Sequence, residues 1–181
     1  MTAAKARRAA LPSRDESIEL LRECGCNDRV IAHCKAVSAL AVKIAKRCGG
    51  DVRLVEIGGL LHDLGRCKAH TISHAVEGAK IARERKLPEA LVNIIERHIG
   101  AGITKDEAKE LGLPEKDYIP LTLEEKIVSH SDNLMSGVDR TSVNEAVAYL
   151  TREGEAQAAL RMLALHKELS ATCGVDLDDI S

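Results

Sequence analysis

The segment Leu60-Leu61-His62-Asp63-Leu64-Gly65-Arg66 combines residues that can do chemistry with residues that can bury them. The adjacent His62 and Asp63 offer an imidazole nitrogen and a carboxylate to the same small volume. The leucines before them predict a buried position, and Gly65 lets the backbone turn away. Because a buried polar group is costly unless it is hydrogen-bonded or bound to a metal, this pair requires a partner.

Further ionisable residues lie on, or at the end of, the apolar faces of other predicted helices: His33, His74, His98 and Asp132. Any one of these histidines alone is readily explained as a hydrogen-bonded core imidazole. Four imidazoles together with two carboxylates instead predict a shared site, because side chains on facing helices build the metal sites of helical domains. Mixed histidine and carboxylate ligands suit divalent transition metals, here Fe, Mn, Co, Ni or Zn.

Helix signals run almost from end to end of the chain and predict an all-α, single-domain helical bundle. Four stretches have the residue pattern of a capping box, and Asn27 and Asp51 are also suitable N-caps. The pattern predicts helices over 27–49, 51–62 and 71–86, then from Pro88 to His98, and a final helical region from Ser142, interrupted at Gly154. The four capping boxes are Ser13–Glu16, Thr104–Glu107, Thr122–Glu125 and Ser142–Glu145.

Composition excludes several classes of protein. The 181 residues carry a formal net charge of −2, so there is no overall basic field for nucleic acid. Phe and Trp are absent and there are two Tyr, which leaves few platforms for stacking bases. Tyr118 is expected to pack in the core, with a role in covering a ligand ring as the alternative. No stretch has the ~20 apolar residues of a membrane span, so we expect a cytoplasmic protein without a membrane partner.

The six cysteines have no CxxC spacing, and Cys24-Gly25-Cys26 is too tight for a zinc knuckle. Cys34 and Cys48 lie within a helical pattern, where cysteine behaves as a small apolar residue. The sequence therefore predicts neither a disulfide nor a zinc site built from cysteines. It places His130 off the helix face of Asp132, as a surface residue, and predicts a structural or exposed role for His166.

The order H…HD…D, at His33, His62-Asp63 and Asp132, resembles that of the HD superfamily of metal-dependent phosphohydrolases. His62 to Gly65 is similar to the HDIG variant of this family, with Leu64 in place of Ile. Residues 72–80 and 97–100 resemble the segments that carry the additional histidines of its binuclear subgroup, and 124–134 resembles its last ligand helix. The resemblance covers about 15–140 and is greatest to small stand-alone archaeal and bacterial members. The chain has the single His98 where cyclic-di-nucleotide phosphodiesterases carry a His-His pair.

This resemblance implies an HD domain over 15–174, with a helical extension from about 142, between a flexible or frayed segment 1–14 and a tail 175–181. It implies two divalent metals. Asp63 would bridge them, with His74 and His98 on the second metal. The residues implied around the first metal are His33, His62, Asp63 and Asp132.

The activity implied is hydrolysis of a phosphomonoester, or of a cyclic or linear phosphodiester, in a small, nucleotide-like metabolite. Asp63 is a catalytic candidate as well as a ligand, and Arg66 and Lys68 are candidates for contacting the phosphate. Arg97 and Lys126 are weaker ones. His70 could act as a general acid or replace His74 as a ligand.

Two other functions share the ligand pattern: a di-iron oxygenase of the HD fold and a non-catalytic metal-binding helical domain. Nearby Arg and Lys favour the phosphohydrolase, and a homo-oligomer is compatible with the sequence.

Overall fold

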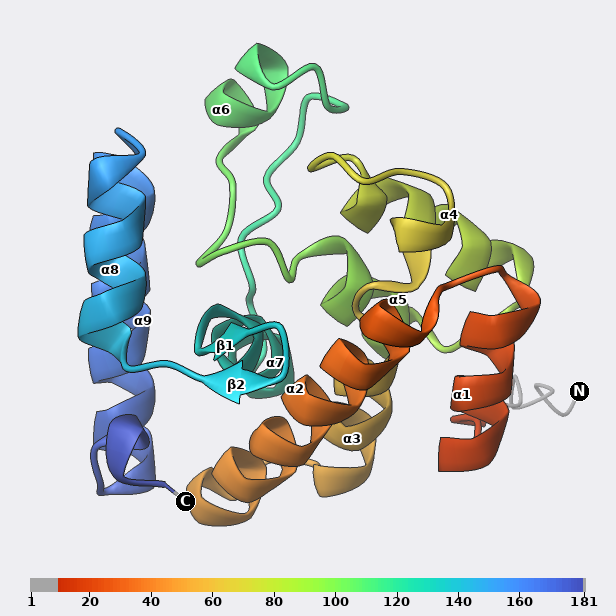
Figure 1. Cartoon of the computed structure of the whole chain (residues 1–181), viewed down its shortest axis with the longest axis horizontal. Coiled ribbons are helices and arrows are strands. Elements are labelled where there is room, and N and C mark those ends of the chain that lie inside the picture. The colour runs from red at the N-terminus through yellow and green to blue at the C-terminus, as the bar shows by residue number, and fades with distance from the viewer. Residues whose placement is uncertain (1–9, 181) are drawn as a thin grey trace, which may run out of the picture.

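The computed structural model describes residues 10–180, so the predictions for residues 1–9 and for Ser181 lie outside the described residues. This part of the chain forms nine α-helices, two short 3-10 helices and one two-stranded hairpin (Figure 1). The all-α prediction is confirmed. The α-helices are α1 (Arg14–Glu23), α2 (Asp28–Cys48), α3 (Val52–Leu61), α4 (His74–Glu84), α5 (Glu89–Glu96), α6 (Lys105–Glu110), α7 (Leu123–Asn133), α8 (Val143–Arg152) and α9 (Ala156–Cys173). The short elements are η1 (Leu64–Cys67), η2 (Leu177–Asp179), β1 (Met135–Ser136) and β2 (Asp139–Arg140), the last two paired antiparallel.

Side-chain caps start most helices at the predicted residues. Ser13, Thr104 and Ser142 each close a complete capping box. The Thr122 hydroxyl accepts from the Glu125 backbone N–H, but the Glu125 carboxylate accepts from the Leu121 N–H instead of closing the box. Two predicted helices are shorter than expected: α4 begins only at His74, and α5 ends before His98.

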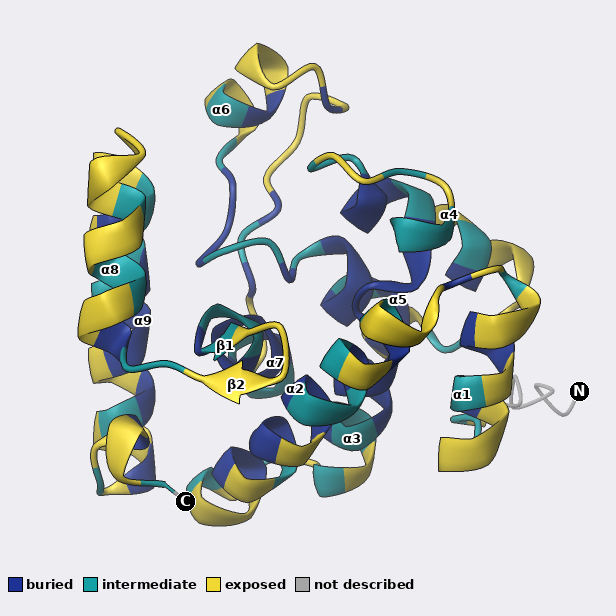
Figure 2. Ribbon diagram, in the orientation of Figure 1, coloured by how far each residue is buried: buried dark blue, intermediate teal, exposed yellow. Residues whose placement is uncertain are grey.

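The core lies between α2, α3, α5 and α7, and buried residues line the inner faces of these helices (Figure 2). α2 and α3 pack closely at Gly59, where there is no room for a side chain. A Cβ added to Gly59 would lie 2.6 Å from the Cα of Ser38. Tyr118 packs in a separate apolar cluster with Ile103 and Leu113, which confirms its core role. Among residues 10–180, the helices are too short or too polar to cross a bilayer.

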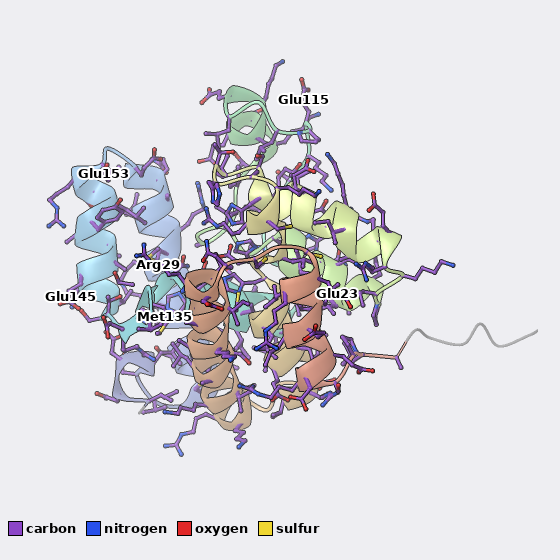
Figure 3. The ribbon with its side chains drawn as sticks, turned by 45° about the vertical axis from the view of Figure 1, so that its right-hand side comes forward. Glu23, Arg29, Glu115, Met135, Glu145 and Glu153 are labelled. Atoms are coloured by element: carbon purple, nitrogen blue, oxygen red, sulfur yellow. A yellow bond between two sulfur atoms is a disulfide. The ribbon has the colours of Figure 1, made fainter. Side chains whose placement is uncertain are left out.

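The C-terminal helices form a hairpin beside the main body, broken at Gly154 as predicted. Figure 3 shows this hairpin from another side, with Glu145 and Glu153 near the two ends of α8. α9 contributes Leu165 and Leu169 to the same core cluster as α2 and α7. Beyond α9, the stretch that we expected to be a tail forms η2, and Leu177 is completely buried.

Two predictions about this region are wrong. Cys48, at the end of α2, forms a disulfide with Cys173, at the end of α9. The two are 125 residues apart, so spacing in the sequence could not reveal the pair. His130 is completely buried rather than exposed, and its Nε2 lies 3.0 Å from the Nδ1 of His166, whose Nε2 lies 2.9 Å from the Asp176 carboxylate.

Gly65 and Gly78 let the turn after Asp63 rest directly on α4, which begins with His74. A Cβ on Gly65 would overlap the His74 carbonyl and approach the Gly78 backbone nitrogen to 2.5 Å. Backbone atoms cannot move aside as a flexible side chain can, so the contact tolerates no side chain at this position.

We therefore expect Gly65→Ala to lower the free energy of unfolding by about 2 kcal/mol or more, as measured by urea titration. Gly50→Ala is the matched control, because its Cβ would meet only side-chain atoms, the nearest being the tip of Ile127 at 3.2 Å. Equal stability of the two variants would contradict the close packing of Gly65.

The disulfide ties the two ends of a long stretch of chain, so its loss is expected to destabilise the fold by about 2–4 kcal/mol. The prediction is tested by comparing Cys48→Ser with Cys24→Ser, which alters a free thiol. Titration of the denatured, unreduced protein should detect the four free thiols, those of Cys24, Cys26, Cys34 and Cys67. Six reactive thiols would show that the bond does not form, and equal stability of the two variants would contradict its expected contribution to stability.

Candidate metal centre

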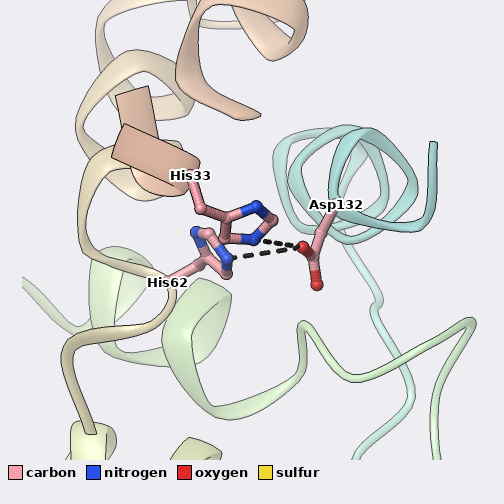
Figure 4. Close-up of side chains that lie close together, drawn as sticks. All are labelled: His33, His62 and Asp132. Atoms are coloured by element: carbon pink, nitrogen blue, oxygen red, sulfur yellow. Dashed lines mark hydrogen bonds and ion pairs between the residues drawn. The ribbon is translucent and has the colours of Figure 1, made fainter. Parts of the chain in front are cut away.

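Four histidines and two aspartates from separate elements meet in one small volume. Figure 4 shows three of them, with His33 and His62 directed at Asp132. The elements supply the side chains as follows: α2 carries His33, the end of α3 carries His62 and Asp63, α4 begins with His74, the turn after α5 carries His98, and α7 carries Asp132 in its last turn.

One half of the site joins His33, His62 and Asp132. Oδ1 of Asp132 lies 2.9 Å from Nε2 of His33 and 3.5 Å from Nε2 of His62. Oδ2 of Asp63 faces the same two nitrogens, at 3.9 Å and 3.7 Å.

The other half joins His74 and His98 to the second oxygen of Asp63. Oδ1 of Asp63 lies 2.9 Å from Nε2 of His74 and 3.6 Å from Nε2 of His98. The two imidazole nitrogens are 3.0 Å apart. The Asp63 carboxylate therefore stands between two groups of imidazoles and presents one oxygen to each.

The tautomer of each imidazole is set by a backbone carbonyl that faces its Nδ1. For three of them the carbonyl lies three residues earlier: Gly59 for His62, Thr71 for His74 and Ile95 for His98, at 2.7–2.8 Å. For His33 it is the distant carbonyl of Gly137, at 2.7 Å. A carbonyl only accepts hydrogen bonds, so each Nδ1 must carry the hydrogen and each neutral Nε2 is left with a lone pair.

The Nε2 lone pairs consequently point at one another and at carboxylate oxygens, which are also acceptors. Nε2 of His62 is buried and has no hydrogen-bond partner. The 3.0 Å contact between His74 and His98 cannot be a hydrogen bond between neutral rings with these tautomers. A cation among the nitrogens removes this conflict, and histidine ligands of metals usually donate their other ring N–H to a carbonyl or carboxylate in this way. The donor set therefore fits divalent metal ions.

The charges in the site favour ionised carboxylates. Burial alone would raise the pKa of Asp63, but in the metal-free site the positive charge of His62, and the N–H groups that His74 and His98 present when they are protonated, hold it far below its ordinary value. The pKa of Asp132 is lowered in the same way, against the effect of burial, by His62 and His33. Two acceptor-only carboxylates are therefore available at neutral pH.

The site opens into a cavity of about 340 Å³ lined by His74, His98 and Asp132, and by Arg66 and His70. Arg66 donates from Nε to Oδ1 of Asp63 at 3.1 Å and from Nη1 to the His70 carbonyl at 2.9 Å, which fixes its guanidinium at the cavity wall. His70 is exposed at the cavity edge, whereas the exposed Lys68 is not among the lining residues.

The two weaker candidates for phosphate contact are occupied elsewhere. Arg97 pairs with the buried Glu125 at 2.9 Å, and Lys126 pairs with Glu168 at 2.6 Å. Sequence reasoning missed Gly137, whose carbonyl orients His33 from the turn between β1 and β2. Only its place in a short polar turn distinguishes this glycine, and no pattern in the sequence connects it to His33.

Comparison with known proteins gives matches over most of the chain. An uncharacterised protein of Methanocaldococcus jannaschii is 45% identical over 163 residues, which cover 86% of this chain and 96% of that protein. A tRNA (cytidine(56)-2'-O)-methyltransferase of Picrophilus torridus is 43% identical over 171 residues, 94% of this chain, but the chain spans only 50% of that enzyme's length.

Among solved structures, the HD domain of the Listeria monocytogenes phosphodiesterase PgpH, in complex with cyclic-di-AMP, superposes with a TM-score of 0.54. It is 18% identical, and the alignment covers 87% of this chain and 94% of that domain. This likeness confirms the fold. The family model for the HD domain matches residues 30–136, a span that contains all six residues of the candidate metal centre. The chain therefore belongs to the HD-domain family.

Proposed function

We propose that the chain is a metal-dependent phosphohydrolase that cleaves a phosphomonoester, or a cyclic or linear phosphodiester, of a small, nucleotide-like substrate. The observation that carries this proposal is the position of Asp63, whose two oxygens face two separate sets of imidazole nitrogens beside an open cavity. One ion would be held by His33, His62, Asp132 and Asp63, and a second by Asp63, His74 and His98.

When bound, two such ions would activate a water for attack on phosphorus and neutralise charge on the phosphoryl oxygens. The protein's own groups then have three tasks. The carbonyl-held imidazoles keep their Nε2 lone pairs directed at the ions. Arg66 donates two of its five N–H groups to the Asp63 carboxylate and the His70 carbonyl, so its other N–H groups could donate to a phosphoryl oxygen. His70, which lines the cavity at its edge, would protonate a leaving oxygen.

The position of Arg66 supports a phosphoester over the oxygen chemistry of the alternative prediction, because a fixed guanidinium recognises phosphate oxygens. The methyl transfer named for the Picrophilus relative is not assigned to this chain, since the matched region is half of that enzyme. Its tRNA substrate does make short RNA a sensible member of a substrate screen, although the composition of this chain does not favour nucleic acid.

Metal content tests the ligand assignment. The wild-type protein, loaded with Mn²⁺ and desalted, is expected to hold about two ions per chain, measured by elemental analysis. His98→Ala should reduce this to about one, because it removes a ligand from only one half of the site. Asp63→Asn should weaken both ions. Equal metal content in the wild type and Asp63→Asn would contradict the bridging role.

Activity tests the reaction. Turnover of p-nitrophenyl phosphate or its bis-ester in the presence of Mn²⁺ should be abolished in Asp63→Asn. Arg66→Gln should reduce kcat/KM by about 10- to 100-fold, the usual effect of losing a hydrogen bond to a charged group, and its metal content should be measured alongside. Lys68→Gln serves as the control with an exposed cation and should stay near wild type.

Two results would contradict the proposal. One is the absence of hydrolysis of these esters and of a nucleotide and short-RNA library by the metal-loaded protein. The other is uptake of oxygen by the reduced iron form without phosphatase activity, which would indicate the oxygenase.

A further inference from the structure

A second cavity, of about 560 Å³, adjoins the metal centre. It shares three wall residues with the first cavity: Ile72, Ile99 and Gly100. The two cavities are therefore neighbours that meet at these three residues. The volume lies within the ~300–1,000 Å³ of ordinary small-molecule sites.

The far wall of this second cavity is built by the C-terminal hairpin. Leu150 comes from α8, and Ala158, Arg161 and Met162 come from α9. In Figure 1 the hairpin stands on one side of the segment between α5 and α6, and α6 lies above that segment. Both helices of the hairpin lie beyond residues 30–136, the part that matches the HD-domain family. This wall thus lies outside the segment that the family model matches.

The walls combine apolar surface with a few fixed polar groups. Nη2 of Arg161 donates to Glu107 at 2.8 Å and so links α9 to α6 across the cavity. Nε of Arg161 is buried without a hydrogen-bond partner, and such an unpaired donor is costly unless a ligand or water meets it. The apolar contribution comes from Ile72, Ile99, Ile103, Leu111, Leu150 and Met162.

The charge of the walls selects against a second phosphate. Three acidic residues, Glu107, Glu110 and Glu155, are among those that line the cavity, and Arg161 is the one basic residue among them. A polyanionic group would meet net negative charge there, whereas an uncharged ring with N–H and O–H donors would find apolar walls and carboxylate acceptors.

We infer that this second cavity binds the organic part of the phosphoester, an uncharged ring-bearing group of the nucleoside class, and that the C-terminal hairpin sets substrate specificity. The inference rests on the proposed function for the position of the phosphoryl group. It favours a nucleoside monophosphate over a nucleoside diphosphate, because the second phosphate would have to lie against the carboxylates.

Ala158→Phe tests this inference, because it places a large side chain in the cavity from a half-buried helical position. The ratio of kcat/KM for AMP to that for methyl phosphate, which lacks the organic group, should fall at least about tenfold, mainly through KM. Ala158→Leu, a smaller intrusion, should give an intermediate ratio. Ala156→Phe is the matched control on the exposed face of the same helix, and all three variants should show wild-type circular dichroism and thermal melting.

Binding of adenosine, followed by isothermal calorimetry, separates this inference from the proposed function. Asp63→Asn protein should bind adenosine as well as the wild type does, and Ala158→Phe should lose most of this binding. If hydrolysis is absent but this pattern holds, the proposed function fails and the nucleoside site stands. If adenosine does not bind the wild type, or binds Ala158→Phe with the same affinity, the inference is overturned.

Discussion

The arrangement of the site depends on one electrostatic constraint. Imidazole nitrogens with lone pairs converge on carboxylate oxygens, and neutral rings of these tautomers offer no hydrogen to place between the two. Each of the four imidazoles donates a hydrogen bond from Nδ1 to a backbone carbonyl. Their Nε2 lone pairs then share a small volume with two carboxylates. Such a cluster is repulsive when the rings are neutral, and it becomes favourable when cations enter. Metal binding at this site would thus be coupled to the local fold, because the backbone that orients the rings is the same backbone that packs the helices.

The helices meet at this point because small residues allow it. Gly59 brings α3 against α2, which places His62 near His33, and Gly65 with Gly78 brings the turn after Asp63 against α4 and His74. These contacts leave little room for adjustment, so the geometry of the donors is determined by backbone packing rather than by flexible side chains. The C-terminal hairpin, held by apolar contacts and by the disulfide between Cys48 and Cys173, adds a wall outside this centre.

Local patterns in the sequence were sufficient to predict the helices and to predict which histidines and aspartates lie close together. Capping residues such as Ser13 and Thr104 act on neighbouring backbone, so their effect is visible in the sequence itself. Long-range pairings were not predictable in this way. The carbonyl of Gly137 reaches His33 from 104 residues away, and nothing local marks either residue for the other. The burial of His130 has the same origin, since its partner His166 comes from α9.

The most direct test of the central claim is the tautomer of the four imidazoles, read by long-range ¹H–¹⁵N NMR of the metal-free protein above the pH of imidazole titration. The account predicts that Nδ1 carries the hydrogen and Nε2 is unprotonated in His33, His62, His74 and His98, and that addition of Zn²⁺ shifts the Nε2 resonances of all four. Hydrogens on Nε2 in these rings, or Nε2 resonances that do not respond to Zn²⁺, would contradict it.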